Sequence, residues 1–92
     1  MTDRQVEALA RFASLLDRDG YPPTLHELAA SLGRSPTVVF GHLDALVDDG
    51  YLARLGPQKK RALSLTPEGR AFVDTVLRIA ATRSHSTNPE EG

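Results

Sequence analysis

The chain has 92 residues, with 11 Lys and Arg against 12 Asp and Glu, a net charge of −1 and no cysteine. A chain of this length builds one compact core, which excludes a two-domain enzyme. The absence of cysteine excludes a disulfide framework, a thiolate zinc site and a cysteine nucleophile. No apolar run is as long as a membrane span, and the N-terminus lacks a signal-peptide pattern, so a cytoplasmic protein without membrane contact is expected.

Apolar residues at helical spacing predict a first helix over residues 2–18. The helix is expected to end at Gly20, which adopts a positive φ readily, and two prolines follow it. A second, short helix begins with Thr24 and Glu27, which are spaced as a capping box, and ends at Gly33.

Ser35 and Pro36 mark the start of a third helix, as an N-cap residue and a proline at the first helical position. This helix is predicted from Pro36 to Asp49, only a tight turn after the second one, with a buried face of Val39, Leu43, Leu46 and Val47. Gly41 inside this helix lowers helix stability by about 1 kcal/mol relative to alanine. We therefore expect another backbone to approach closely at this position.

Two short β-compatible runs follow, Tyr51–Leu55 and Arg61–Leu65, and residues 56–60 between them contain the Gly-Pro pair of a hairpin turn. Three helices and a hairpin in this order predict a mainly α fold with a small two-stranded wing, a winged helix-turn-helix over residues 1–66.

Thr66 and Pro67 predict the N-cap and first residue of a last helix over residues 67–82. Its apolar stripe is broad enough for two partners, so we expect a homodimer through this helix; the alternative is that the stripe packs only on the first helix. Residues 83–92 carry no apolar pattern and are expected to be a disordered tail.

The charges are unevenly distributed along the chain. No acidic residue occurs from Tyr51 to Pro67, whereas the end of the third helix carries Asp44, Asp48 and Asp49. The wing is therefore a basic patch in a chain of nearly neutral total charge, which is compatible with double-stranded DNA as the partner. The candidate DNA-binding residues on the third helix and wing are Arg34, Ser35, Thr37, Val38, Phe40, Gly41, Arg54, Lys59, Lys60 and Arg61.

These candidates divide by chemistry. Thr37 suits a hydrogen bond to a base or phosphate, Val38 and Phe40 suit thymine methyl groups, and the wing cations suit phosphates. Phe40 also fits the core by its spacing, and the sequence leaves burial and DNA contact equally open.

Nothing in the sequence indicates catalysis. His26 and Glu27 match the start of a zinc-protease helix motif, but Ala30 stands where the second histidine belongs. No enzyme activity, metal, cofactor or small-molecule ligand is predicted.

Residues 2–52 resemble the N-terminal DNA-binding domain of the LexA repressor family, through Arg4-Gln5, Gly20 with Pro22-Pro23-Thr24, Glu27-Leu28-Ala29, Gly33-Arg34-Ser35-Pro36 and His42-Leu43. Residues 61–69, RALSLTPEG, are similar to the wing and following helix of MarR-type and PadR-type regulators. The LexA resemblance implies that the base-facing positions are Ser35, Thr37, Val38, Phe40 and Gly41. Val38, Phe40 and Gly41 replace polar and acidic residues of the family pattern, so the LexA operator is not implied.

The resemblance and the charge pattern together predict a sequence-specific DNA-binding transcriptional repressor. The self-cleaving protease domain of the LexA family does not occur in these 92 residues, so derepression by cleavage is not expected of them. The alternative is a winged-helix module that binds proteins instead of DNA, which the neutral charge and the apolar third helix would allow.

Overall fold

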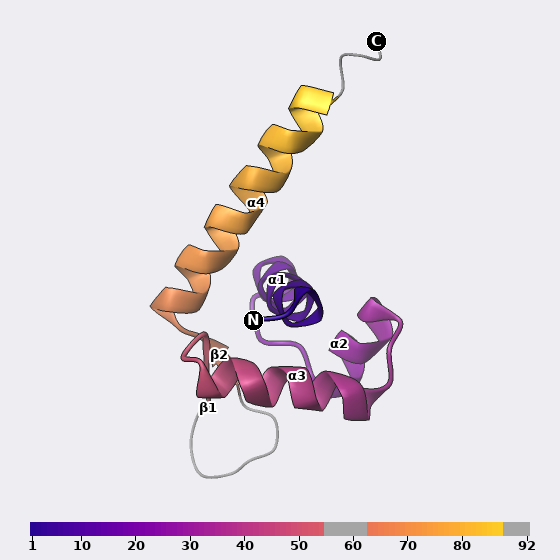
Figure 1. Cartoon of the computed structure of the whole chain (residues 1–92). Helices are drawn as coiled ribbons and strands as arrows, with labels where there is room; N and C mark the ends of the chain where they lie inside the picture. The colour runs from indigo at the N-terminus through magenta and orange to yellow at the C-terminus, as the bar shows by residue number, and fades with distance from the viewer. Residues whose placement is uncertain (55–62, 88–92) are drawn as a thin grey trace.

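The computed structural model describes residues 1–54 and 63–87, with the side chains of the last helix described up to residue 81. Its elements are α1 (Asp3–Asp19), α2 (Leu25–Leu32), α3 (Pro36–Asp48), β1 (Leu52–Arg54), β2 (Leu63–Leu65) and α4 (Pro67–Thr87). Helices α1, α2 and α3 form the body, the hairpin lies beside the end of α3, and α4 leads away from the body (Figure 1). The predicted winged helix-turn-helix is confirmed.

Local side-chain hydrogen bonds fix where the first two helices begin. The hydroxyl of Thr24 accepts from the Glu27 amide at 3.1 Å, and the Glu27 carboxylate accepts from the Thr24 amide at 3.0 Å, as the capping box predicted. Thr2 and Gln5 form a second capping box at the start of α1, which the sequence analysis did not identify. Both helices end on glycines with positive φ, 82° at Gly20 and 70° at Gly33.

One hydrophobic core joins the three body helices to the hairpin and to α4. Its largest fully buried side chains are Phe12, Leu9, Leu28, Leu46, Leu52, Val39 and Val73, which come from every helix and from β1. Burying a side chain of this size contributes about 1.5 to 3 kcal/mol. The core therefore holds α3 at a fixed place on the body.

The wing is an antiparallel hairpin. Leu52 pairs with Leu65 and Arg54 with Leu63, and among the described residues 52–54 and 63–65 are in strand conformation. Of the predicted strand residues, Leu55, Arg61 and Ala62 lie outside the described part of the chain. The turn, with Lys59, Lys60 and Arg61, lies outside the described residues.

The start of α4 is attached to the body by Thr66. Its hydroxyl accepts from the Gly69 amide at 2.9 Å, which confirms Thr66 as the N-cap, and donates to the Gly50 carbonyl oxygen at 2.7 Å. Gly69 is buried, and a Cβ placed on it would overlap the carbonyl oxygen of Tyr51 and lie 2.9 Å from Leu65 Cδ1. Only glycine allows α4 to approach the hairpin this closely.

Helix α4 continues to Thr87, beyond the predicted end at residue 82. The backbone of residues 83–87 is thus part of α4, residues 88–92 lie outside the described part of the chain, and the disordered tail over residues 83–92 stays a prediction. A helix that has already formed several turns gains one backbone hydrogen bond for each residue added, so it continues without an apolar pattern.

Candidate nucleic-acid interface

The turn between α2 and α3 presents the start of α3 at the surface. The amides of Gly33 and Arg34 donate to the last carbonyl groups of α2, at 3.2 and 3.1 Å. Ser35 then caps α3, its hydroxyl accepting from the Val38 amide at 3.2 Å. This is the predicted N-cap, and it leaves the positive end of the helix dipole facing outward.

The first two turns of α3 have one buried and one exposed side. Val39 is completely buried, whereas Thr37 and Gly41 are exposed. The side chains of Val38 and Phe40 are 47% and 52% exposed. The structure therefore decides the question left open for Phe40, which lies at the surface and not in the core.

Gly41 has no close neighbour in the described part of the chain. A Cβ built on it would meet no heavy atom within 4 Å. The expected close approach of another backbone is thus not found inside the described chain.

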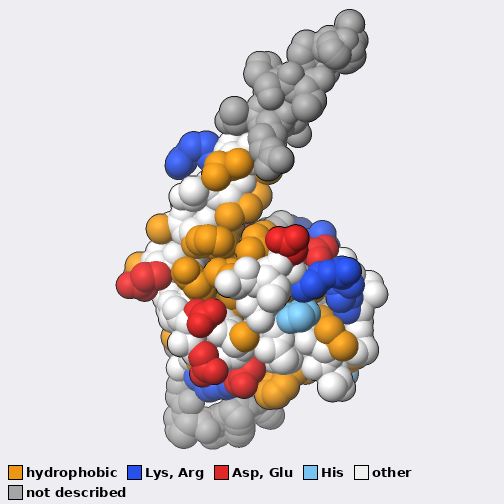
Figure 2. All heavy atoms as spheres, viewed as in Figure 1, with side chains coloured by type: hydrophobic (Ala, Val, Ile, Leu, Met, Phe, Trp, Pro, Cys, Tyr) orange, Lys and Arg blue, Asp and Glu red, His pale blue; other side chains and the backbone are white. Residues whose placement is uncertain are grey.

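The second half of α3 is acidic at its surface. Asp44, Asp48 and Asp49 are exposed there, and Figure 2 shows acidic side chains grouped on the lower left of the body. Arg54 of the wing donates to the Asp44 carboxylate at 2.5 Å, with both side chains about half exposed. This pair neutralises the carboxylate nearest the exposed first turns of α3, and the role of Arg54 as a candidate DNA-binding residue stays a prediction.

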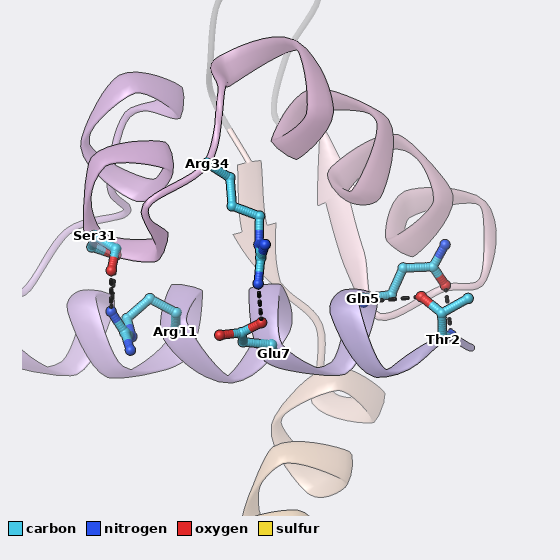
Figure 3. Close-up of polar contacts among 6 residues, drawn as sticks. All are labelled: Thr2, Gln5, Glu7, Arg11, Ser31 and Arg34. Atoms are coloured by element: carbon cyan, nitrogen blue, oxygen red, sulfur yellow. Dashed lines mark hydrogen bonds and ion pairs between the residues drawn. The ribbon is translucent and has the colours of Figure 1, made fainter.

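Arg34 is also held within the chain. Its guanidinium lies 3.2 Å from the Glu7 carboxylate, and Figure 3 shows the side chain extending from the α2–α3 turn onto α1. A second contact, from Arg11 of α1 to the Ser31 carbonyl oxygen at 2.7 Å, joins the last turn of α2 to α1, one helical turn along α1 from Glu7. Glu7, Arg11 and Ser31 were not identified from sequence, because no local motif joins residues this far apart.

Helix α4 is anchored on α1 near its own beginning. Arg70 donates to both carboxylate oxygens of Asp17, at 2.7 and 3.1 Å, and its hydrogen bond lowers the pKa of Asp17. Val73 is buried against the body, and the Phe72 ring lies 5.2 Å from the Tyr51 ring. Past this anchor the apolar stripe emerges from the body, with Leu77 and Ile79 54% and 51% exposed.

The described residues contain no group of three or more His, Asp and Glu side chains able to hold a metal ion. In the same part of the chain, no helix combines the length and the apolar character that crossing a membrane requires.

The first two turns of α3 thus present an uncharged, exposed surface, and the wing, whose sequence is basic, lies beside the end of the same helix. The model of the LexA DNA binding domain matches residues 1–62, which contain the helix-turn-helix and the first strand of the wing. The chain belongs to the LexA DNA-binding domain family.

Similar proteins include two LexA repressors. That of Anaeromyxobacter sp. is 45% identical over the whole chain, which corresponds to 40% of the repressor. That of Limosilactobacillus fermentum is 41% identical over 74% of the chain and 33% of the repressor. The chain thus spans about a third to two-fifths of the length of these relatives.

Among solved structures, a Staphylococcus aureus MarR in complex with salicylate and kanamycin has the same fold, with a TM-score of 0.76 and 17% sequence identity. The match covers 95% of this chain and 57% of the MarR chain. The LexA-type body and the following long helix therefore both fit a MarR-like winged helix.

Proposed function

We propose that this LexA-type domain is a sequence-specific repressor that inserts the first two turns of α3 into the major groove of double-stranded DNA. The observation that carries the proposal is the exposed start of α3, where Ser35 caps a helix whose outward side is exposed at Thr37 and meets no described atom within 4 Å of a Cβ placed on Gly41. Helix starts of this kind place side chains against base edges and backbone amides toward phosphates. A repressor bound over a promoter would exclude the transcription machinery by occupying its site, in the cytoplasm where the DNA lies.

Phosphate contact is assigned to Lys59, Lys60 and Arg61 of the wing. Arg34 and Arg54 contact carboxylates of the same chain, so their positive charge is already partly compensated. The three turn cations follow Arg54 in a segment free of acidic residues. They would supply the electrostatic part of the affinity, which depends on salt because phosphate contacts release counterions.

The repressor is proposed to act as a homodimer through the apolar face of α4. Beyond Val73 this face continues with Val76, Leu77, Ile79 and Ala80, and it leaves the body with the helix (Figure 1). Hydrophobic side chains extend along α4 in Figure 2 as far as the described side chains reach. A second copy covering this face would present two α3 helices to two half-sites, related by the dimer axis.

Selection of bound duplexes from a random pool tests DNA recognition. We expect an enriched palindromic consensus, and light scattering on the same sample is expected to give two subunits. Failure to enrich any sequence would contradict the proposal and favour a protein-binding module.

Replacing Lys59, Lys60 and Arg61 with alanine tests the wing. The logarithm of the affinity is expected to depend less steeply on the logarithm of salt concentration, by about 2 to 3 in slope. The control removes two exposed cations of α1, Arg4→Ala with Arg18→Ala, and is expected to leave the slope nearly unchanged. An unchanged slope in the wing variant would exclude its role.

Leu77→Glu with Ile79→Glu tests the dimer. The charges would be buried in the proposed contact, so a monomer is expected by light scattering. Ala71→Glu places the same charge on the opposite, exposed side of α4 and should leave the dimer intact. A dimer that persists in the double variant would exclude this face as the interface.

A further inference from the structure

The outward side of α3 has an unusual chemistry for a helix that binds DNA. No charged residue and no side-chain amide occurs from Ser35 to Gly41. The polar side chains of these two turns are the hydroxyls of Ser35 and Thr37, and the Ser35 hydroxyl already accepts from the Val38 amide. Pairs of hydrogen bonds from arginine, asparagine or glutamine, which distinguish guanine and adenine, are therefore not available on these two turns.

The surface there consists of two apolar side chains with small residues between them. Successive residues of an α-helix are rotated by about 100° about its axis. Val38 and Phe40 therefore lie on either side of the line along the helix surface that joins Thr37 and Gly41. Both apolar side chains are about half exposed, at 47% and 52%, and neither belongs to the core cluster. The small central residues let the helix approach the groove floor, so the two flanking side chains face the groove walls.

The acidic second half of α3 restricts the contact to these turns. Asp44 and Asp48 follow along the same side of the helix and would be repelled by phosphates if the helix lay deeper in the groove. Arg54 pairs with Asp44 and so limits this repulsion at the boundary.

On the major-groove edge of a base pair, the thymine C5-methyl group is the apolar feature. It projects toward the side of the groove next to its own strand, which is where side chains on the flanks of a helix lie. We infer that this domain recognises its half-site by two thymine methyl groups, one contacted by Val38 and one by Phe40. This inference rests on the proposed binding of α3 in the major groove, and it specifies which bases are recognised.

The test replaces thymine by deoxyuridine, which removes the methyl group and keeps every base-pairing group. In the duplex enriched by selection, each thymine of a half-site is replaced singly, and affinity for the full chain is measured. Two of these replacements are expected to weaken binding about fourfold each, the value of one buried methyl group. Deoxyuridine outside the half-sites is the control and should change nothing.

Substitutions in the protein assign each methyl group to its side chain. Phe40→Ala should weaken binding to the thymine duplex and abolish the deoxyuridine effect at one position only, and Val38→Ala should do so at the other. Phe40→Leu keeps an apolar contact and should retain the effect. Circular dichroism checks that each variant is folded, as expected for exposed positions.

The outcomes distinguish recognition of thymine methyl groups from DNA binding itself. An enriched half-site without thymine, or equal affinity for thymine and deoxyuridine duplexes, would overturn methyl recognition and leave DNA binding standing. A deoxyuridine effect that persists in both alanine variants would overturn the assignment to Val38 and Phe40. If no duplex is enriched, the proposed function fails and this inference fails with it.

Discussion

Two glycines inside helices, Gly69 in α4 and Gly41 in α3, occur in opposite surroundings. A Cβ on Gly69 would overlap the Tyr51 carbonyl oxygen, whereas a Cβ on Gly41 would meet nothing within 4 Å in the described chain. In a helix interior, as at Gly41, glycine lowers stability by about 1 kcal/mol relative to alanine, whereas Gly69 lies in the first turn of α4. The fold explains the first glycine by lack of space, and it offers no comparable reason for the second.

The difference separates a region whose packing requires glycine from one where the fold leaves space, which is where the proposed DNA contact lies. The start of α4 is fixed by Thr66, Gly69 and Val73, which are all engaged with the body. The start of α3 is fixed only on its inner side, and its outer side is apolar, exposed and open. Substitutions at the two sites should therefore affect stability and DNA binding differently.

Gly69→Ala should have the largest effect on stability. The added methyl group overlaps a backbone oxygen that cannot rotate away, so a loss of about 3 kcal/mol in the free energy of unfolding is expected. Urea denaturation measures it. A loss in unfolding free energy below about 1 kcal/mol would resemble that of an ordinary surface substitution. It would show that α4 can move away from the hairpin, and that Gly69 is no more crowded in solution than Gly41.

The two N-cap residues allow a matched comparison of the regions. Ser35 accepts one hydrogen bond, whereas Thr66 accepts one and donates another to the Gly50 carbonyl oxygen. Thr66→Ala should therefore cost about 2 kcal/mol and Ser35→Ala about 1 kcal/mol in unfolding free energy. Equal losses would mean that the contact between Thr66 and Gly50 contributes nothing to stability.

Gly41→Ala should raise the free energy of unfolding by about 1 kcal/mol, because alanine favours the helix and space is available. The same methyl group would hinder the approach of α3 to the groove floor, and affinity for the selected duplex is expected to fall about tenfold. Denaturation and a binding titration on one preparation measure both. A variant that gains stability and binds DNA as before would show that no partner approaches Gly41.

The smallest effect is expected from the ion pair between α1 and α4, since both side chains are substantially exposed. The Arg70 hydrogen bond lowers the pKa of Asp17 below its ordinary 3.8, so the pair stabilises the fold above that pH. This stabilisation is lost as the pH falls through the lowered pKa. Asp17→Asn should lower the melting temperature slightly at pH 7, and the difference from the original chain should shrink near pH 3.

Asp48→Asn, which removes an exposed carboxylate from α3, is the control for that experiment. A melting-temperature difference for Asp17→Asn that stays constant from pH 7 to pH 3 would exclude the ion pair as its cause.

Much of the fold could be predicted because its signals are local. The capping box at Thr24, the N-caps Ser35 and Thr66 and the glycine after α2 each act within one helical turn, so sequence spacing suffices to find them. The end of α4 was placed too early, because continuation of a helix needs no apolar signal.

The candidate site was only partly predictable. The exposed positions of α3 other than Phe40 follow from helical periodicity, but the partners of the arginines do not. Arg34 and Arg54 contact Glu7 and Asp44, and only the packing of α1, α3 and the wing brings these pairs together. The sequence placed both arginines among the candidate DNA-binding residues, because it shows charge and not distance.

The sequence by itself determined the order of the elements, their caps and a basic wing in a nearly neutral chain, because these depend on neighbouring residues and on composition. Only the tertiary structure decided that Phe40 is exposed and that Arg34 and Arg54 form ion pairs within the chain. It also decided that Gly69 has a close backbone neighbour and Gly41 has none in the described chain. These properties depend on which surfaces meet in space. Helical spacing places Phe40 near the edge of the buried face, and the position of the neighbouring elements then leaves it at the surface.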